Sequence, residues 1–289
     1  MTVLLNMQRY MNFSFFLALV LQLMACKNEQ SVTTTPTPQT PQYQPTDSAA
    51  LVAVVKDTIA TIPAKLPKTA IDSNSRIIYF TFDDGPLSPT PYLTEIINEK
   101  QIKISEFAVG KHANANKQFR KHLEDMKRNP LIEVHNHSIS HANSKYKEYY
   151  SAPASAAKDI MDNEEIIGTY SKIVRMPGRD IWATPKVQRG WHQSGAKTAA
   201  ILLENGFKVY GWDMEWSHRG GVPKGTAEQL VAQVDRQFQT QYMQMPNHLI
   251  ILAHDEMMIR EKGRTDLRKI IDMLKERGYI FEFISHYPL

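Results

Sequence analysis

From residue 76 to the C-terminus, short apolar runs alternate with longer amphipathic segments, and no other feature of the sequence constrains the fold as strongly. Strands that alternate with helices predict parallel β/α units. Seven such strands can form an open doubly wound sheet or a barrel, and in both the chemistry gathers where the strands end. The predicted strands are Ile77–Phe82, Ile104–Val109, Leu131–His135, Ile173–Met176, Phe207–Trp212, His248–Ala253 and Tyr279–Ile284. The predicted helices lie near Tyr92–Glu99, Lys117–Arg128, Ala156–Tyr170, Thr198–Glu204, Thr226–Gln239 and Asp266–Glu276.

Composition excludes several classes of protein. Hydrophobic residues make up 42% of the 289 residues and charged residues 22%, which is typical of a chain with a folded core. The net charge of +4 is too small to indicate nucleic-acid binding, and nothing in the sequence indicates an obligate protein partner. A single cysteine excludes a disulfide framework and a zinc site built on several thiolates, so any metal would need His and carboxylate ligands.

The first 26 residues are predicted to be a signal peptide. Arg9 precedes an apolar run, Phe13–Met24, which is too short to span a bilayer as a helix. The run ends in Leu-Met-Ala-Cys, which resembles a bacterial lipobox whose cysteine, Cys26, would be acylated and become the first mature residue. The alternative is an ordinary secretory signal with an unrelated thiol. We therefore expect a protein of the cell envelope, held to a membrane by a lipid on Cys26, on its outer-membrane, periplasmic or surface face.

Residues 27–71 are predicted to be a tether, and residues 72–289 the folded domain. Between Ser31 and Asp47 there are six Thr and four Pro in seventeen residues, a composition that cannot bury a core. A short helix is possible over Ala49–Ala60, ended by Pro63.

Acids and imidazoles follow the first and third predicted strands. Asp83 and Asp84 end the first strand; either they form a surface turn, or one binds a cation while the other stays free as a base. His137 and His141, after the third strand, would lie on the same side of one helical turn. Two imidazoles and a carboxylate make an open metal site, although such a pair also occurs on surface helices. For His135 we favour packing.

Three further strands end in residues able to do chemistry. Arg175 follows the fourth strand and is suited to orient a carboxylate. Asp213 and Glu215 follow the fifth, and His254 follows the sixth. One rim would therefore carry acids, imidazoles and an arginine from five strands, an arrangement that favours catalysis over a structural role.

Together these stretches resemble the polysaccharide deacetylase family, also called the NodB-homology or carbohydrate esterase 4 family. The resemblance runs from Arg76 to the C-terminus. It rests on Thr-Phe-Asp-Asp-Gly at residues 81–85, His-Ser-x-x-His at residues 137–141 and Leu-x-His at residues 252–254. It implies an α/β fold, a distorted barrel of about seven β/α units.

The resemblance also implies roles for individual residues. Asp84, His137 and His141 would hold a divalent metal, usually Zn²⁺, with Co²⁺, Ni²⁺ or Mn²⁺ as alternatives. Asp83 would be the general base and His254 the general acid.

Other family positions are matched less fully. Arg175 would position Asp83, and the backbone N–H of Gly178 would stabilise the oxyanion. Gly178 stands where the family has an aromatic residue, so Trp182 is the candidate to supply that wall of the acetyl pocket. Leu252, in the last motif, is a further candidate for substrate contact.

For two sets of residues the resemblance to the family leaves alternatives. The fourth family motif ends in an Asp-Trp pair whose Asp pairs with the acid; here Asp213 is preferred as the partner of His254 and Glu215 is kept in reserve. Trp191, His192 and Trp216 would either stack on sugar rings or pack within loops. Glu106 is unexpected in a second strand that is usually aromatic.

The function predicted is a metal-dependent hydrolase that removes N-acetyl groups from an acetylated polysaccharide, such as peptidoglycan, a chitin-like polymer or poly-N-acetylglucosamine. The alternatives are an acetyl-ester hydrolase on xylan-like glycans, a hydrolase of small cyclic amides, and a non-catalytic glycan-binding surface lipoprotein.

Overall fold

The computed structural model describes residues 71–289. The predicted signal peptide, the lipidation site Cys26, the short helix and all but the last residue of the tether lie outside the described residues. Within residues 71–289, no helix combines the length and the apolar character needed to cross a bilayer.

The sheet is built on four long strands and several strands of two residues. Its strands are β1 (Ile77–Asp83), β2 (Ile104–Ala108), β3 (Ile132–Asn136), β4 (Ile173–Val174), β5 (Trp182–Ala183), β6 (Gln188–Arg189), β7 (Lys208–Val209), β8 (Met214–Glu215), β11 (His248–His254) and β12 (Ile280–Phe281). A separate antiparallel hairpin is formed by β9 (His218–Arg219) and β10 (Val222–Pro223).

The helices lie between the strands. They are α2 (Thr90–Lys100), α3 (Gly110–Ala113), α4 (Lys117–Arg128), α5 (Tyr146–Ser151), α6 (Pro153–Ile167), α7 (Ala196–Glu204), α8 (Ala227–Thr240) and α9 (Glu261–Glu276). Short 3₁₀ turns are η1 (His141–Ser144), η2 (Asp255–Ile259) and η3 (Ile284–His286).

The order of the strands decides between the two predicted architectures. Along the sheet the order is β6-β5-β7-β4-β3-β2-β1-β11-β8, with β12 also paired to β1. From β7 to β1 the parallel neighbours follow chain order, and β11 returns to the free side of β1. The sheet therefore winds in one direction and curls as a barrel does, rather than reversing at a switch point. The α/β barrel-type fold is confirmed, in an incomplete form whose edges are β6 and β8.

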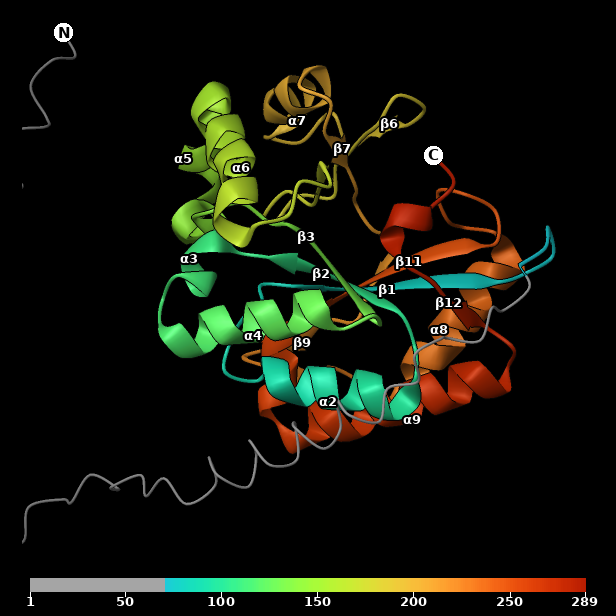
Figure 1. Cartoon of the computed structure of the whole chain (residues 1–289). Helices are drawn as coiled ribbons and strands as arrows, with labels where there is room; N and C mark the ends of the chain where they lie inside the picture. Colours follow the sequence, from blue (N-terminus) through green and yellow to red (C-terminus); the bar gives the residue numbers. More distant parts are fainter. Residues whose placement is uncertain (1–70) are drawn as a thin grey trace, which may run out of the picture. The chain divides into compact units, whose positions relative to one another are not determined.

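Strand β1 lies at the centre of the fold because both of its faces are buried. Ile78, Phe80 and Phe82 pack against the apolar sides of α2, α4, α8 and α9, which cover the outer face (Figure 1). Ile77 and Tyr79 point the other way, into an inner aromatic cluster. Side chains alternate along a strand, so Asp83 belongs to the inner face. In the parallel pairing of β1 and β11, Asp83 lies opposite His254.

The predicted elements are largely confirmed, with differences at their ends. The α4 bounds are as predicted, whereas the fourth and fifth strands shrink to the two-residue β4 and β7. Pro177 and Gly178 follow the fourth stretch, and proline cannot donate a ladder hydrogen bond, whereas Gly211 interrupts the fifth. The β9–β10 hairpin, β5, β6 and α5 have no strong periodicity in the sequence and were not predicted.

Candidate active site

The carboxylate of Asp83 is held by a buried guanidinium. Arg175 donates from one terminal nitrogen to Asp83 Oδ1 at 2.8 Å and to Thr81 Oγ1 at 2.7 Å, and from the other to the carbonyl of Gly211. The contact with Asp83 is a single hydrogen bond, not the bidentate fork that the residue type allows. Arg175 is fully buried, so its charge acts at close range with little screening from water.

This pairing keeps Asp83 ionised. Burial alone would raise the pKa of Asp83, but Arg175, followed by His137 and His254, outweighs burial and leaves that pKa below its ordinary value. Oδ2 of Asp83 lies 3.5 Å from Nε2 of His137. A charged carboxylate is thus directed toward the neighbouring imidazoles.

Asp84, by contrast, faces an environment that disfavours its charge. Burial, and then the carboxylates of Asp83, Glu256 and Asp255, raise the pKa of Asp84 to about 8. Its Oδ1 is buried and has no hydrogen-bond partner within the described residues. An ionised carboxylate at this position would need a positive charge close to it for stabilisation.

The imidazole of His137 is fixed in one tautomer. Its Nδ1 lies 2.8 Å from the carbonyl oxygen of Arg175, which can only accept, so the ring donates from Nδ1. The lone pair on Nε2 is then free and lies 3.7 Å from Asp84 Oδ1. Burial lowers the pKa of His137, which favours the neutral form that binds metal.

His141 completes the group, but not through a helical turn. Residues 137–140 are non-helical, and the 3₁₀ turn begins at His141, in a stretch with left-handed backbone at Ser138 and at 141–144. The turn still brings Nε2 of His141 to 3.1 Å from Asp84 Oδ1. Burial, and then His137, lower the pKa of His141 to about 3.

These three residues fit a divalent cation. One donor atom from each of Asp84, His137 and His141 lies within 4.8 Å of the other two, the only such group of three in the described part of the chain. Two neutral imidazoles and an unpartnered carboxylate oxygen are the ligand types of an open zinc-like site. The geometry and the donor chemistry are both suitable for a metal.

His254 lies on the other side of Asp83 from this group. It ends β11 at the position paired with Asp83, and Leu252 lies two residues earlier on the same inner face. Nδ1 of His254 is buried and has no hydrogen-bond partner in residues 71–289.

Gly178 lies at the end of the segment after β4, close to His141. Its φ of 62° is in the left-handed region, and no hydrogen bond of the described residues uses its N–H. The ring of Tyr146 lies where a side chain on Gly178 would be, 3.0 Å from an ideal Cβ. The same ring makes an edge contact with His141, with centroids 5.8 Å apart.

Residues 70–189, which include Asp83, Asp84, His137, His141 and Gly178, match the family model for polysaccharide deacetylases. The chain carries a polysaccharide deacetylase domain. Its fold is that of the solved catalytic domain of a peptidoglycan N-acetylglucosamine deacetylase from Eubacterium rectale. That structure has a TM-score of 0.56 and 24% identity, and the match covers 77% of this chain and 95% of that one.

Two curated bacterial proteins are similar to the chain over most of its length. A peptidoglycan-N-acetylglucosamine deacetylase of Bacillus cereus is 25% identical over 267 residues, covering 86% of this chain and 88% of that protein. A putative polysaccharide deacetylase of Bacillus subtilis is 25% identical over 221 residues, covering 74% and 69%. The similarity therefore extends through the deacetylase domain and beyond the residues that the family model matches.

Trp182 does not form the wall of the acetyl pocket that was predicted for it. Its ring is fully buried in the inner aromatic cluster, 5.9 Å from Tyr210 and 5.6 Å from Tyr287. Because β5 directs the side chain into the barrel, the prediction is wrong. In the deacetylase domain the aromatic ring next to Gly178 is that of Tyr146.

Asp213 does not contact His254, the residue predicted to be the acid. Its carboxylate accepts hydrogen bonds from the backbone N–H groups of Gln244 and Ile250, which fixes the start of β11. Among the residues described, none of its hydrogen bonds reaches His254. The reserve candidate, Glu215, is exposed on β8 and forms no ion pair with any other residue of the range 71–289. The assignment of Asp213 is corrected to a structural one.

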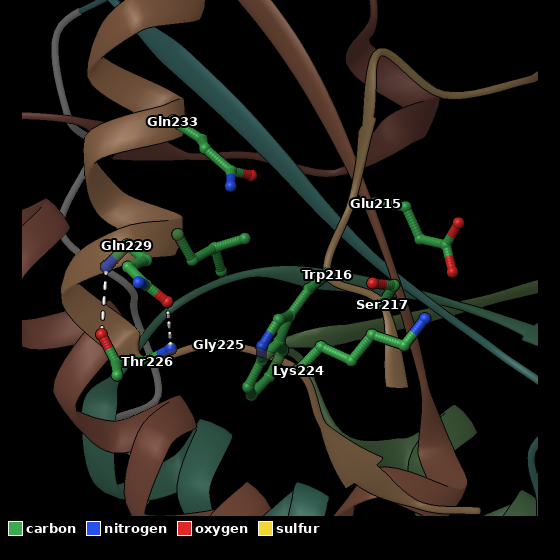
Figure 2. Close-up of a pocket in the computed structure, with 9 residues that line it drawn as sticks. Glu215, Trp216, Ser217, Lys224, Gly225, Thr226, Gln229 and Gln233 are labelled. Carbon is green, nitrogen blue, oxygen red and sulfur yellow. Dashed lines mark hydrogen bonds between the residues drawn. The ribbon is translucent and has the colours of Figure 1, made fainter. Parts of the chain in front are cut away.

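Trp216 is a core residue and not a platform for sugars. Only 2% of it is exposed, and its ring packs 6.4 Å from that of Phe80. Figure 2 shows it at the base of a polar cleft of about 160 Å³, between β8, the turn after β10 and the start of α8. The candidate metal ligands follow β1 and β3 instead, so this cleft is separate from the candidate metal site.

The remaining aromatic and imidazole candidates mostly pack. His135 packs, as expected from the sequence, and is buried between Ser171 and Glu133. Trp191 is partly buried and donates to the carbonyl of Trp182. His192 alone of these is exposed.

Two buried acids behind Asp84 were not assigned from the sequence. Glu106 accepts from the N–H of Gly85 at 2.8 Å, which fixes the turn after the two aspartates. Asp255 accepts from the hydroxyl of Thr90. Glu106 was noticed only as an unusual residue in its strand, and nothing in its spacing indicated this contact.

Proposed function

We propose that this protein is a metal-dependent deacetylase that removes acetyl groups from N-acetylated sugars of an envelope polysaccharide. The observation that carries the proposal is the convergence of Asp84, His137 and His141 beside an ionised Asp83, with His254 paired to Asp83 across the sheet. Each part is needed to hydrolyse an amide.

Asp83 is proposed as the general base. The hydrogen bond from Arg175 keeps its carboxylate ionised and directs its free oxygen toward His137. Asp83 can therefore take a proton from a water molecule as that water adds to the acetyl carbonyl carbon. A divalent cation held by Asp84, His137 and His141 would supply Lewis acidity, lowering the pKa of water and polarising the carbonyl.

His254 is proposed as the general acid. When the C–N bond breaks, the electron pair stays on the sugar nitrogen, which is a poor leaving group until a proton reaches it. His254 gives that proton, and the products are acetate and a free amino sugar. Asp83 and His254 each contribute roughly 10²–10⁴-fold, the usual range for a positioned acid or base.

Gly178 and Tyr146 are proposed to hold the acetyl group. The unused N–H of Gly178 can donate to the oxygen that becomes negative in the transition state. Tyr146 closes the space above Gly178 and so limits the size of the acyl group. Leu252, on the inner face below His254, is proposed as an apolar contact.

Peptidoglycan is the substrate best supported by the relatives, because the curated Bacillus cereus protein is named as a peptidoglycan-N-acetylglucosamine deacetylase. Chitin-like polymers and poly-N-acetylglucosamine carry the same acetamido group. We further propose that a lipid on Cys26 anchors the protein in the cell envelope, where such polymers are accessible. Zinc is the proposed metal, because of the two imidazole ligands.

Acetate release tests this function. The full-length mature protein is incubated with N-acetylglucosamine oligomers, peptidoglycan and acetylated xylan, with and without a chelator. Release from the first two that stops with chelator and returns with Zn²⁺ supports the proposal. Release from xylan alone would make the protein an esterase, and metal binding with no release from any substrate would make it a glycan-binding protein.

A further inference from the structure

The β9–β10 hairpin carries a histidine to the proposed acid. The ring centroid of His218, on β9, is 4.7 Å from that of His254, with the two planes 57° apart. This is direct contact between two imidazoles. One of them is the group that would protonate the leaving nitrogen.

His218 is itself held in place. Its Nδ1 lies 2.9 Å from Oε1 of Glu256, in the 3₁₀ turn directly after His254. The N–H of Gly221, at the tip of the hairpin, is 3.2 Å from the same Glu256 oxygen and 3.3 Å from Nδ1 of His218. Gly221 has a φ of 73°, and a Cβ there would meet the carbonyl of Glu256 at 2.9 Å. The hairpin is thus closely fitted against η2.

His218 is suited to lie against a histidine that carries a proton. The titratable groups around it are Glu215 on β8, Lys224 directly after β10, Glu256 on η2 and His254 on β11. Burial, and then His254, lower the pKa of His218, so its ring is neutral near pH 7. A neutral ring contacts a protonated imidazole without repelling its charge.

Among the described residues, no hydrogen bond orients the ring of His254. Its buried Nδ1 makes no hydrogen bond within residues 71–289, and the carboxylate expected there, Asp213, bonds to backbone N–H groups elsewhere. Packing therefore has to set the rotation of the ring.

We propose that His218, held by Glu256, is a positioning residue that fixes the ring of His254 for proton transfer to the leaving nitrogen. This inference rests on the proposed function and names a residue that the family motifs do not supply. The effect of His218 on the rate should therefore depend on the leaving group, because only a poor leaving group needs the proton. An amide depends on a well-oriented acid, whereas an aryl acetate, whose phenolate leaves readily, does not.

The experiment compares the two substrates in the full-length protein. In His218→Ala, kcat on chitooligosaccharide should fall roughly tenfold or more, whereas kcat on 4-nitrophenyl acetate stays within about twofold. His218→Phe keeps a ring in contact and should recover part of the lost amide turnover. Glu256→Ala should resemble His218→Ala more weakly, and Glu215→Gln is the matched control with no change on either substrate.

Equal losses on both substrates would show a merely structural role, and an undiminished amide rate would show no role. Either result overturns the proposal. A second readout does not depend on turnover: the ratio of the two His254 ring tautomers, from ¹⁵N chemical shifts. The ratio should change in His218→Ala and stay constant in Glu215→Gln. A constant ratio in both refutes the inference, whereas an inactive wild type with a changed ratio refutes only the deacetylase function.

Discussion

Replacing Arg175 by methionine is expected to damage both stability and catalysis, for one reason. The methionine side chain has a similar length, but the substitution removes a fully buried charge that donates hydrogen bonds to Asp83, Thr81 and Gly211. Asp83 would be left with its side chain 4% exposed and its strongest stabilising partner gone.

The magnitude follows from this burial. Breaking a buried ion pair by removing one partner costs about 3–5 kcal/mol, because the remaining charge is left uncompensated. For a folded region of this size, that loss lowers Tm by about 6–20 °C. Arg175→Lys keeps the charge but loses the planar guanidinium that reaches all three acceptors. Its loss of stability should therefore be smaller than that of Arg175→Met.

The stability lost in Arg175→Met should depend on pH. The pKa of Asp83 is lowered in the folded protein, so its pairing stabilises the fold above the unfolded-state pKa and that contribution is lost as pH falls through the folded-state pKa. In Arg175→Met, only the histidines still oppose the effect of burial, so the pKa of Asp83 rises. The stability gap between wild type and variant should be widest above the raised pKa of Asp83 in the variant, and it should narrow as pH falls toward the lowered pKa of Asp83 in the wild type.

Urea unfolding from pH 7 down to pH 3.5, followed by tryptophan fluorescence, measures this gap. The acidic limb of the kcat/KM profile should also move to higher pH in Arg175→Met, because the base is protonated sooner. A gap of under about 1 kcal/mol at pH 7, or one that does not change with pH, would refute the account of the buried pair.

Three other perturbations test separate parts of the account. Asp83→Asn should keep zinc affinity but lose roughly 10²-fold or more in kcat, measured by acetate release; near-normal rates would refute the assignment of the base. Tyr146→Ala should open the acetyl pocket and raise the ratio of butyryl to acetyl release from N-acylated glucosamine oligomers; an unchanged ratio means that the ring does not limit acyl size. Cys26→Ala should move the protein from the membrane fraction to the soluble fraction on immunoblots, and unchanged fractionation would exclude the lipid anchor.

Much of the fold could be predicted because its central strands are buried on both faces. Ile77–Asp83 and His248–His254 are mostly apolar runs that end in polar residues, and such runs indicate parallel strands. The convergence of the candidate metal ligands could be predicted for a related reason. Parallel strands bring their carboxyl ends to one rim, so Asp84, His137 and His141 meet although they are far apart in the sequence.

The rest could not be predicted because it depends on orientation. Trp182 and Trp216 lie in loops or two-residue strands, where no periodicity says which way a ring points. Asp213 has backbone N–H groups within reach, and these become apparent only when β11 is placed beside it. The contact of His218 with His254 depends on a glycine-tipped hairpin whose strands are two residues long.

Asp84, His137 and His141 are proposed to hold the cation on which acetate release depends. Zinc binding by isothermal titration calorimetry, on protein stripped with chelator, tests it most directly when the same samples are assayed for acetate release. We predict one zinc per chain and restored release in the wild type, with both lost in His137→Ala and both kept in His192→Ala. Tight zinc binding that survives His137→Ala, or acetate release by fully stripped protein, would contradict the account.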